Sequence, residues 1–79
     1  MITNAMFWSA IDGLAASRKI SCSRMARISG IDVTALNKSK RTGHDGRQYW
    51  MSVGTLVKIL DATHTEWDEF AKFFPQNSK

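Results

Sequence analysis

Cysteine, proline and glycine are scarce in this 79-residue sequence, which contains one, one and five of them. Because Cys22 is the sole thiol, no internal disulfide can form, and His44 and His64 lack the further ligands that a zinc site needs. Disordered and fibrous chains usually contain more proline and glycine than this sequence does, so both classes are excluded. A core of this size stabilises by only about 3–5 kcal/mol. Regular helix packing within one domain, residues 1–79, is therefore the expected source of stability.

A long apolar run is also missing. No stretch approaches the roughly 20 apolar residues of a membrane helix. The N-terminal region lacks the basic start of a secretory signal, and Asp12 interrupts its apolar stretch. A single unpaired cysteine suits a reducing compartment. We therefore expect a cytoplasmic protein with no membrane partner.

Positive charge is concentrated in the middle of the chain, which carries a net charge of +4. Eight of the eleven lysines and arginines lie between residues 18 and 47, where only Asp32 and Asp45 oppose them. Four of the seven acids follow between residues 61 and 69. A basic middle and an acidic end predict one surface that faces a polyanion and another that faces away. The alternative is that these charges only solvate an ordinary small domain.

Apolar residues recur at helical spacing along the chain, and no credible pair of strands is present. We therefore predict an all-α fold of five helices, of which the last four begin at a residue that can act as N-cap. The first three helices cover about residues 4–17, 21–29 and 32–41, and the fourth and fifth follow the caps Ser52 and Thr65.

The predicted helices differ in the apolar surface that they carry. The fourth is expected to be the most buried, with Val53 and Val57 among its core residues. In the fifth, Trp67 and Ala71 are expected to point inward. The third offers little to the core besides Leu36, so most of its surface is available for another partner.

Residues 22–41, CSRMARISGIDVTALNKSKR, have the spacing of a helix-turn-helix, which we predict over about 21–41. Ala26 is small where two helices cross, and Gly30 forms the sharp turn four residues later. Ile31 and Leu36 then attach the following helix to the core. In a helix-turn-helix that second helix lies in the major groove of DNA.

This segment resembles the Cro/repressor-type helix-turn-helix family, and the resemblance extends over nearly the whole chain. It is closest to the N-terminal DNA-binding domains of phage-repressor-like regulators that carry a self-cleaving serine-peptidase domain downstream. No such domain follows here, and Ile28 and Ser29 stand where a basic and an apolar residue are common. The resemblance implies a compact, five-helix, nucleoid-associated bacterial regulator of transcription, with repression as the expected mode. The residues that carry it are Phe7-Trp8, Ala10-Ile11-Asp12, Leu14-Ala15, Ala26, Gly30, Asn37–Arg41, Asp45–Arg47, Trp50, Ser52 and Asp68–Ala71.

Double-stranded DNA is the expected partner, and helix-turn-helix geometry assigns two sets of contacts. Base edges should meet residues near the start of the third helix, because lysine can donate to guanine and a side-chain methyl group can contact thymine. Phosphates should meet basic side chains and the backbone N–H groups at helix N-termini. The base-contacting set is Val33, Thr34, Asn37 and Lys38, and the phosphate-contacting set is Ser21, Ser23, Lys40, Arg41, Arg47 and Ser52.

Operators of such domains are commonly two-fold symmetric, so a weak homodimer on DNA is expected. No separate dimerisation element is present. Either the chain is a fragment, or it dimerises through its own surface, where Ile28 and Phe73 are candidates.

A protein-interaction module is the main alternative function, as a regulatory subunit or an antirepressor-like factor. It would need large apolar anchors on the third helix.

Tyr49 and Trp50 could stack on single-stranded bases, although a loop packed onto the fourth helix is the preferred interpretation.

No acid–base pair, nucleophile–base pair or phosphate loop is present in the sequence, so we expect no enzyme, no catalytic residue, no cofactor and no metal.

Overall fold

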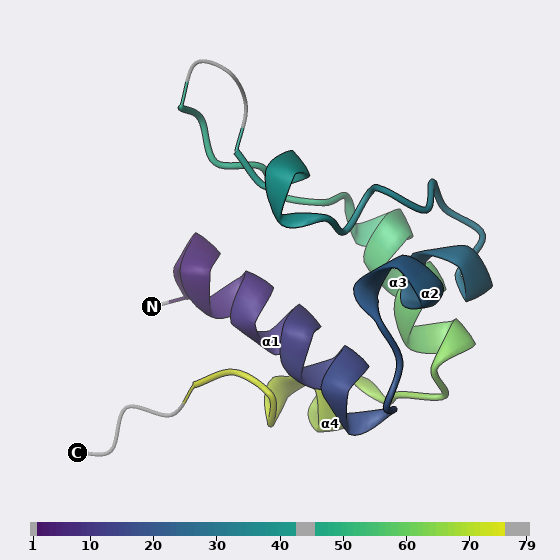
Figure 1. Ribbon diagram of the computed structural model, residues 1–79. Coiled ribbons are helices and arrows are strands. Elements are labelled where there is room, and N and C mark those ends of the chain that lie inside the picture. Colours follow the sequence, from purple (N-terminus) through teal and green to yellow (C-terminus); the bar gives the residue numbers. More distant parts are fainter. Residues whose placement is uncertain (1, 43–45, 76–79) are drawn as a thin grey trace.

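The computed structural model describes residues 2–42 and 46–75, and four α-helices occur in those ranges. A single β-bridge pairs Thr42 with Gln48 among the described residues, so the all-α prediction is confirmed. In Figure 1, α1 crosses the middle of the molecule, α4 lies below it, and α2 and α3 pack together at one end. The helical elements are α1 (Asn4–Ser17), α2 (Cys22–Ile28), the 3₁₀ helix η1 (Lys38–Lys40), α3 (Val53–Ala62) and α4 (Trp67–Ala71).

Side-chain caps start three of the α-helices. The hydroxyl of Ser21 accepts a hydrogen bond from the backbone N–H of Arg24 at 3.0 Å, and Ser52 accepts one from Thr55 at 3.1 Å. Thr3 caps α1 in the same way. Gly30 follows α2 with a φ of 75°, in the left-handed region that glycine adopts without strain. The caps predicted at Ser21 and Ser52 and the turn predicted at Gly30 are confirmed.

The core surrounds α1, which is the central helix. Ile11 and Leu14 on α1 are fully buried, together with Met25 of α2 and Ile59 of α3. Ala26 is also fully buried, in keeping with its small size at the position where α2 approaches its neighbours. Burial of these side chains is the main force that holds the four helices together.

The third predicted α-helix, over 32–41, is not confirmed. The carboxylate of Asp32 accepts hydrogen bonds from both the backbone N–H and the hydroxyl of Thr34, at 2.8 and 2.7 Å. Backbone hydrogen bonds then join residues three apart, and Asn37 is extended, with φ and ψ of −66° and 147°. Short polar side chains offer the backbone local partners that compete with an α-helix. The segment is therefore two tight turns, the second of them η1.

The predictions for α3 and α4 also need correction. Val53 and Val57 are 71% and 45% exposed, and Trp67 is 56% exposed. The apolar residues of α3 surround more of the helix than its neighbours can cover, and the face with Ile59 is the one that is buried. Ala71 is likewise exposed rather than inward-facing.

Thr65 is not the cap that was predicted for the last helix. The N-cap position of α4 is Glu66, and its side chain makes no capping hydrogen bond. The hydroxyl of Thr65 instead lies 2.8 Å from both the Thr63 hydroxyl and the Arg18 guanidinium. Its pairing within the molecule explains why it is not available to the helix.

The loop before α3 packs on α1, not on α3 as predicted. The carbonyl of Tyr49 accepts hydrogen bonds from the side chains of Asn4 and Trp8, at 2.9 and 3.1 Å. The ring of Trp50 lies 5.6 Å from that of Phe7. No helix in the described part of the chain has both the length and the apolar character needed to cross a membrane.

Candidate nucleic-acid interface

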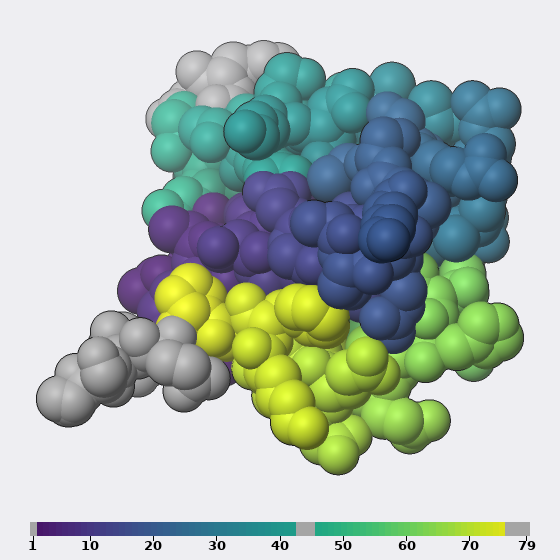
Figure 2. All heavy atoms as spheres, turned by 60° about the horizontal axis from the view of Figure 1, so that its bottom comes forward, coloured from purple at the N-terminus to yellow at the C-terminus, as the bar shows by residue number. Residues whose placement is uncertain are grey.

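Residues 31–42 lie on one side of the molecule, across α1 from α4. In Figure 1 they run along the top, between α2 and the loop that leads to α3. Figure 2 shows the same separation in the space-filling view, with the teal segment above the purple surface of α1 and the yellow C-terminal region below it. The separation of basic and acidic surfaces predicted from the charge pattern is compatible with this arrangement.

One stripe of α1 positions this segment and the loop that follows. Asn4, Trp8 and Asp12 are spaced four residues apart, so they share a face of the helix. Asn4 and Trp8 hold the Tyr49 carbonyl, and Asp12 holds Arg41. The backbone N–H of Tyr49 also donates to the carbonyl of Arg41 at 2.9 Å, which joins the two segments directly.

The Arg41 side chain is used inside the molecule. Its two terminal nitrogens lie 3.0 and 2.7 Å from the two carboxylate oxygens of Asp12, and one of them also donates to the Leu36 carbonyl at 2.9 Å. The guanidinium carbon sits 4.4 Å from the centre of a Trp8 ring. Only 12% of the side chain is exposed. Arg41 therefore positions the segment, and the phosphate contact expected of it does not fit this geometry.

The Arg41 guanidinium also determines the ionisation of its neighbours. Its hydrogen bonds hold the pKa of Asp12 below the ordinary aspartate value, and Asp12 in turn raises the pKa of Arg41. The thiol of Cys22 lies 3.4 Å from a carboxylate oxygen of Asp12. Burial, followed by that carboxylate, raises the pKa of Cys22, so the thiolate is disfavoured.

The four residues expected to contact bases lie in these two turns but differ in exposure. Val33 is 41% exposed, and Lys38 is exposed at the start of η1. Thr34 is half-buried, and its hydroxyl is already donated to Asp32, which leaves its methyl group and its acceptor capacity. Asn37 is half-buried, and its side-chain amide has no hydrogen bond within the described residues. These positions offer a donor, an amide and a methyl group to a partner.

The residues expected to contact phosphate differ in their exposure and in whether their side chains are already hydrogen-bonded. Lys40 and Arg47 are exposed, and the bridge between Thr42 and Gln48 brings their two segments close together. Ser52 is exposed, but its hydroxyl oxygen accepts from Thr55 as the cap of α3. Ser21 has the same capping role at α2, and Ser23 is half-buried. At Ser21 and Ser52, backbone N–H groups of the first helical turn rather than the capping hydroxyls remain to meet an anion.

Arg24 and Arg27 extend the basic surface beyond the predicted contacts. Both are exposed, and no ion pair involves them among the described residues. The positioning roles of Asn4, Trp8 and Asp12 were missed by sequence analysis, which treated Asp12 as an interruption of an apolar stretch and as one of the residues that carry the family resemblance. Their spacing of four residues is the signal that could have revealed them.

Metal chemistry finds no support in the described residues, where no three histidine, cysteine, aspartate or glutamate side chains come together. His44 and Asp45 lie outside the described residues. Neither the family models, nor the curated proteins, nor the solved structures that were compared with the chain gave a match.

Proposed function

We propose that this protein binds double-stranded DNA as a sequence-specific regulator of transcription, with repression as its mode. One observation carries the proposal. Residues 31–42 carry two exposed lysines, Lys38 and Lys40, and Arg41 of the same segment attaches it to α1 by binding Asp12. A basic segment that is both exposed and positioned is what recognition of a polyanion of regular shape requires.

The two turns take the place of the second helix of a helix-turn-helix. Lys40, Arg27 and Arg24 would neutralise phosphates and so fix the orientation of the protein on the duplex. Asn37 and Lys38 would meet base edges, since an amide pairs with adenine N6 and N7 and a lysine with guanine O6 and N7.

The proposal is tested by fluorescence anisotropy with a labelled random-sequence duplex across a salt series. The log of the binding constant should fall with the log of salt concentration by about 0.9 for each phosphate neutralised. A Lys38→Ala/Lys40→Ala variant should bind more weakly and with a slope that is shallower by about 0.9, because Lys40 is the one of the two that meets phosphate. Selection of an operator sequence would follow, and Asn37→Ala should then reduce discrimination between sequences more than it reduces overall affinity.

The matched control is Lys58→Ala/Lys72→Ala, which removes the same charge from exposed residues on α3 and at the end of α4. This control should keep most of the affinity and nearly the full slope. Absence of binding at low salt would refute the proposal. Equal losses in both double variants would mean that net charge, not this surface, attracts the DNA.

A protein-interaction module remains the second candidate, because Ile28 and Val33 are apolar and 47% and 41% exposed beside the basic residues. Phe73, the other residue considered for association, packs against α1 at Gly13 and is half-buried, so it offers less apolar surface than Ile28 does. Ile28→Ser should leave DNA binding unchanged if the first function is right and Ile28 lies outside the DNA contact. A loss of DNA affinity that tracks a loss of dimer in sedimentation experiments would assign Ile28 to self-association.

A further inference from the structure

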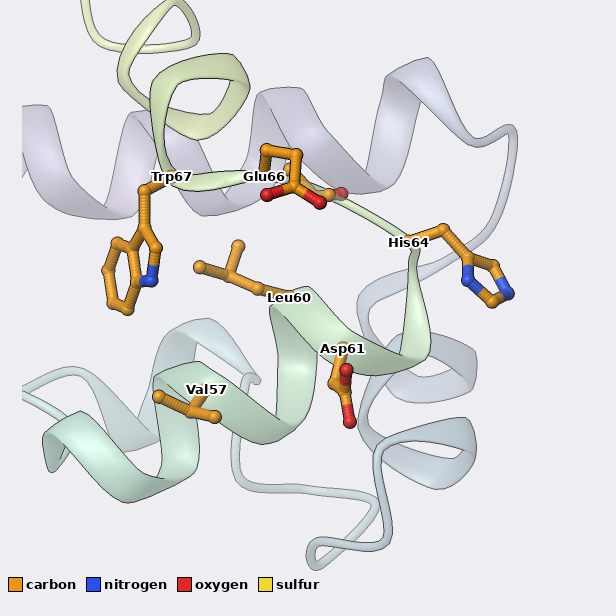
Figure 3. A pocket seen from close by; sticks show the side chains of 7 residues that line it. Val57, Leu60, Asp61, His64, Glu66 and Trp67 are labelled. Carbon is orange, nitrogen blue, oxygen red and sulfur yellow. The ribbon is translucent and has the colours of Figure 1, made fainter.

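A second surface of the molecule lies between the end of α3 and the start of α4, and the proposed DNA contact does not use it. A cavity of about 300 Å³ opens there, a volume at the lower end of ligand pockets and suited to one or two side chains. It is lined by Val57, Leu60, Asp61, His64, Thr65, Glu66 and Trp67. Figure 3 shows Leu60 at its centre, Trp67 and Val57 on one side, and the His64 ring turned away.

Part of the cavity wall is apolar and open to solvent. Trp67 is 56% exposed and Val57 is 45% exposed, whereas Leu60 beneath them is only 4% exposed. Val53, one turn before Val57 on α3, is 71% exposed and extends the apolar surface. A neighbouring group of large exposed apolar side chains on so small a domain is a feature of interaction sites.

The remaining wall is acidic. The carboxylates of Asp61 and Glu66 lie on either side of Leu60 in Figure 3. Neither carboxylate has an ion pair or a hydrogen bond among the described residues. Asp61 also stands in the last turn of α3, where the helix dipole disfavours a negative charge. A bound cation would relieve that unfavourable placement.

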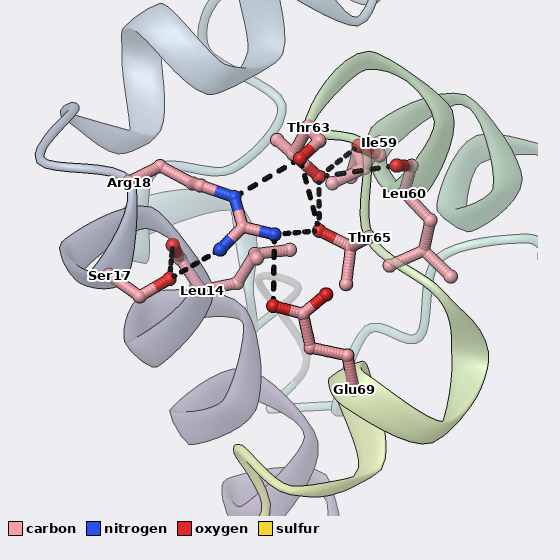
Figure 4. Close-up of polar contacts among 8 residues, drawn as sticks. All are labelled: Leu14, Ser17, Arg18, Ile59, Leu60, Thr63, Thr65 and Glu69. Carbon is pink, nitrogen blue, oxygen red and sulfur yellow. Dashed lines mark hydrogen bonds and ion pairs between the residues drawn. The ribbon is translucent and has the colours of Figure 1, made fainter.

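The neighbouring acid, Glu69, is already paired. Its carboxylate lies 3.2 Å from the Arg18 guanidinium, which also donates to the Thr63 carbonyl at 3.1 Å and to the Thr65 hydroxyl at 2.8 Å (Figure 4). Arg18 is thus committed to this network and faces Glu69 rather than the cavity acids. The same network holds the Thr65 hydroxyl at the edge of the cavity.

Elsewhere in this molecule, an aromatic ring and a carboxylate together bind an arginine side chain. The guanidinium of Arg41 stacks over the ring of Trp8 and donates two hydrogen bonds to the carboxylate of Asp12. It thus combines a cation–π contact with a bidentate ion pair. The cavity presents the same two elements, Trp67 with Asp61 and Glu66, but without an arginine. A guanidinium is a better match than an ammonium, because its planar fork can stack and pair at once.

We propose that this cavity docks a partner protein through an arginine side chain flanked by apolar residues. The arginine lies against Trp67 and pairs with Glu66 and Asp61, and the flanking residues cover Val57 and Val53. The residues that line the cavity are not among those proposed to contact DNA. This proposal does not rest on the DNA-binding function.

The test uses the acetylated, amidated peptide Leu-Arg-Leu, and the same peptide with citrulline, which keeps the shape of arginine without its charge. Binding is followed by the ¹H–¹⁵N resonances of the Trp67 indole and of the α3 backbone. The arginine peptide should shift both sets of resonances saturably and leave the Trp8 indole unmoved. The citrulline peptide should bind about tenfold more weakly, equivalent to about 1.4 kcal/mol.

Three variants locate the site. Trp67→Ala should abolish the saturable shifts in α3, and Glu66→Gln should weaken binding about tenfold. Asp68→Asn is the matched control, because Asp68 is an exposed acid in the first turn of α4 that does not line the cavity. It should bind as the wild type does, and an equal loss there would show that only the general negative charge matters.

Three results would overturn the proposal. Equal affinity for the citrulline peptide would remove the role of the cation. Methylguanidinium binding as tightly as the arginine peptide would identify a site for a small free cation instead of a protein segment. A concentration-dependent dimer, abolished by Trp67→Ala, would assign the surface to a second copy of this chain.

Discussion

The four α-helices and the segment 31–50 contribute unequally to the core. Of the twelve buried apolar side chains among the described residues, eleven belong to α1–α4 and only Leu36 belongs to the segment. The segment is instead attached by directional bonds, from Asp12 to Arg41 and from Asn4 and Trp8 to the Tyr49 carbonyl. Burial brings helices together without specifying one exact backbone path. Where regular structure is absent, hydrogen bonds of defined geometry supply that path.

The largest expected effect comes from the helical part. Ile11→Ala removes a fully buried side chain from the centre of the core and should lower the free energy of unfolding by about 2–5 kcal/mol. That loss is comparable to the whole stability of a domain of this size. Urea titration followed by circular dichroism measures it. Val53→Ala, at a site 71% exposed, should stay within about 0.5 kcal/mol of wild type, and an equal loss there would contradict the assignment of the core.

A smaller and more local effect is expected from the polar attachment. Arg41→Ala should cost about 1–3 kcal/mol, since it leaves the partners of several charged hydrogen bonds unsatisfied. Hydrogen exchange should speed up at the Tyr49 amide and in residues 37–41, while α1 amides near Leu14 stay protected. Arg24→Ala, an exposed arginine on α2, is the control and should change neither. Uniform loss of protection would mean that the segment and the core unfold as one unit.

The same attachment should depend on pH. Because the folded-state pKa of Asp12 is lowered by Arg41, its contribution to stability is fully present above the ordinary aspartate pKa of about 3.9. It is lost as the pH falls through the lower folded-state value. Urea midpoints of wild type and Asp12→Asn should therefore differ near neutral pH and converge in strong acid. A difference that does not vary with pH would exclude the carboxylate charge as its cause.

The smallest effect is expected at the junction of the two regions, where Ser52 caps α3. Ser52→Ala should cost about 1 kcal/mol, because one backbone donor of the first turn loses its acceptor. Ser52→Asp should restore most of the stability, since its carboxylate can accept the same hydrogen bond. Thermal unfolding of the three proteins measures both changes, and a failure of the aspartate variant to recover would argue against a capping role.

Local signals in the sequence were sufficient for most of the helical part. Ser21 and Ser52 act as caps and Gly30 adopts the positive φ, because each of these roles depends on the residue itself and its immediate neighbours. The buried stripe of α1, with Ile11 and Leu14, follows equally well from periodicity. These features survive in almost any tertiary context that keeps the helix amphipathic.

The errors concern residues whose environment is supplied by distant parts of the chain. Val57 and Trp67 are apolar, yet no neighbouring element covers them. Thr65 has the composition of a cap, but Arg18, 47 residues earlier, takes its hydroxyl. Arg41 was assigned to phosphate because arginines often contact it, whereas Asp12 binds it from 29 residues away. Periodicity and propensity carry no information about such partners.

The sequence by itself determined the helical class, the starts of α2 and α3, the turn at Gly30 and the separation of basic from acidic residues along the chain. All of these depend on short-range sterics, capping and charge order. The tertiary structure decided that residues 31–41 form two turns rather than a helix, and that Arg41 faces Asp12 and Trp8 instead of solvent. It also placed Trp67, Asp61 and Glu66 around one cavity, where neither carboxylate has an ion pair within the described part of the chain. These outcomes depend on which distant side chains meet, and only the packed chain brings them within the few ångströms over which hydrogen bonds and ion pairs act.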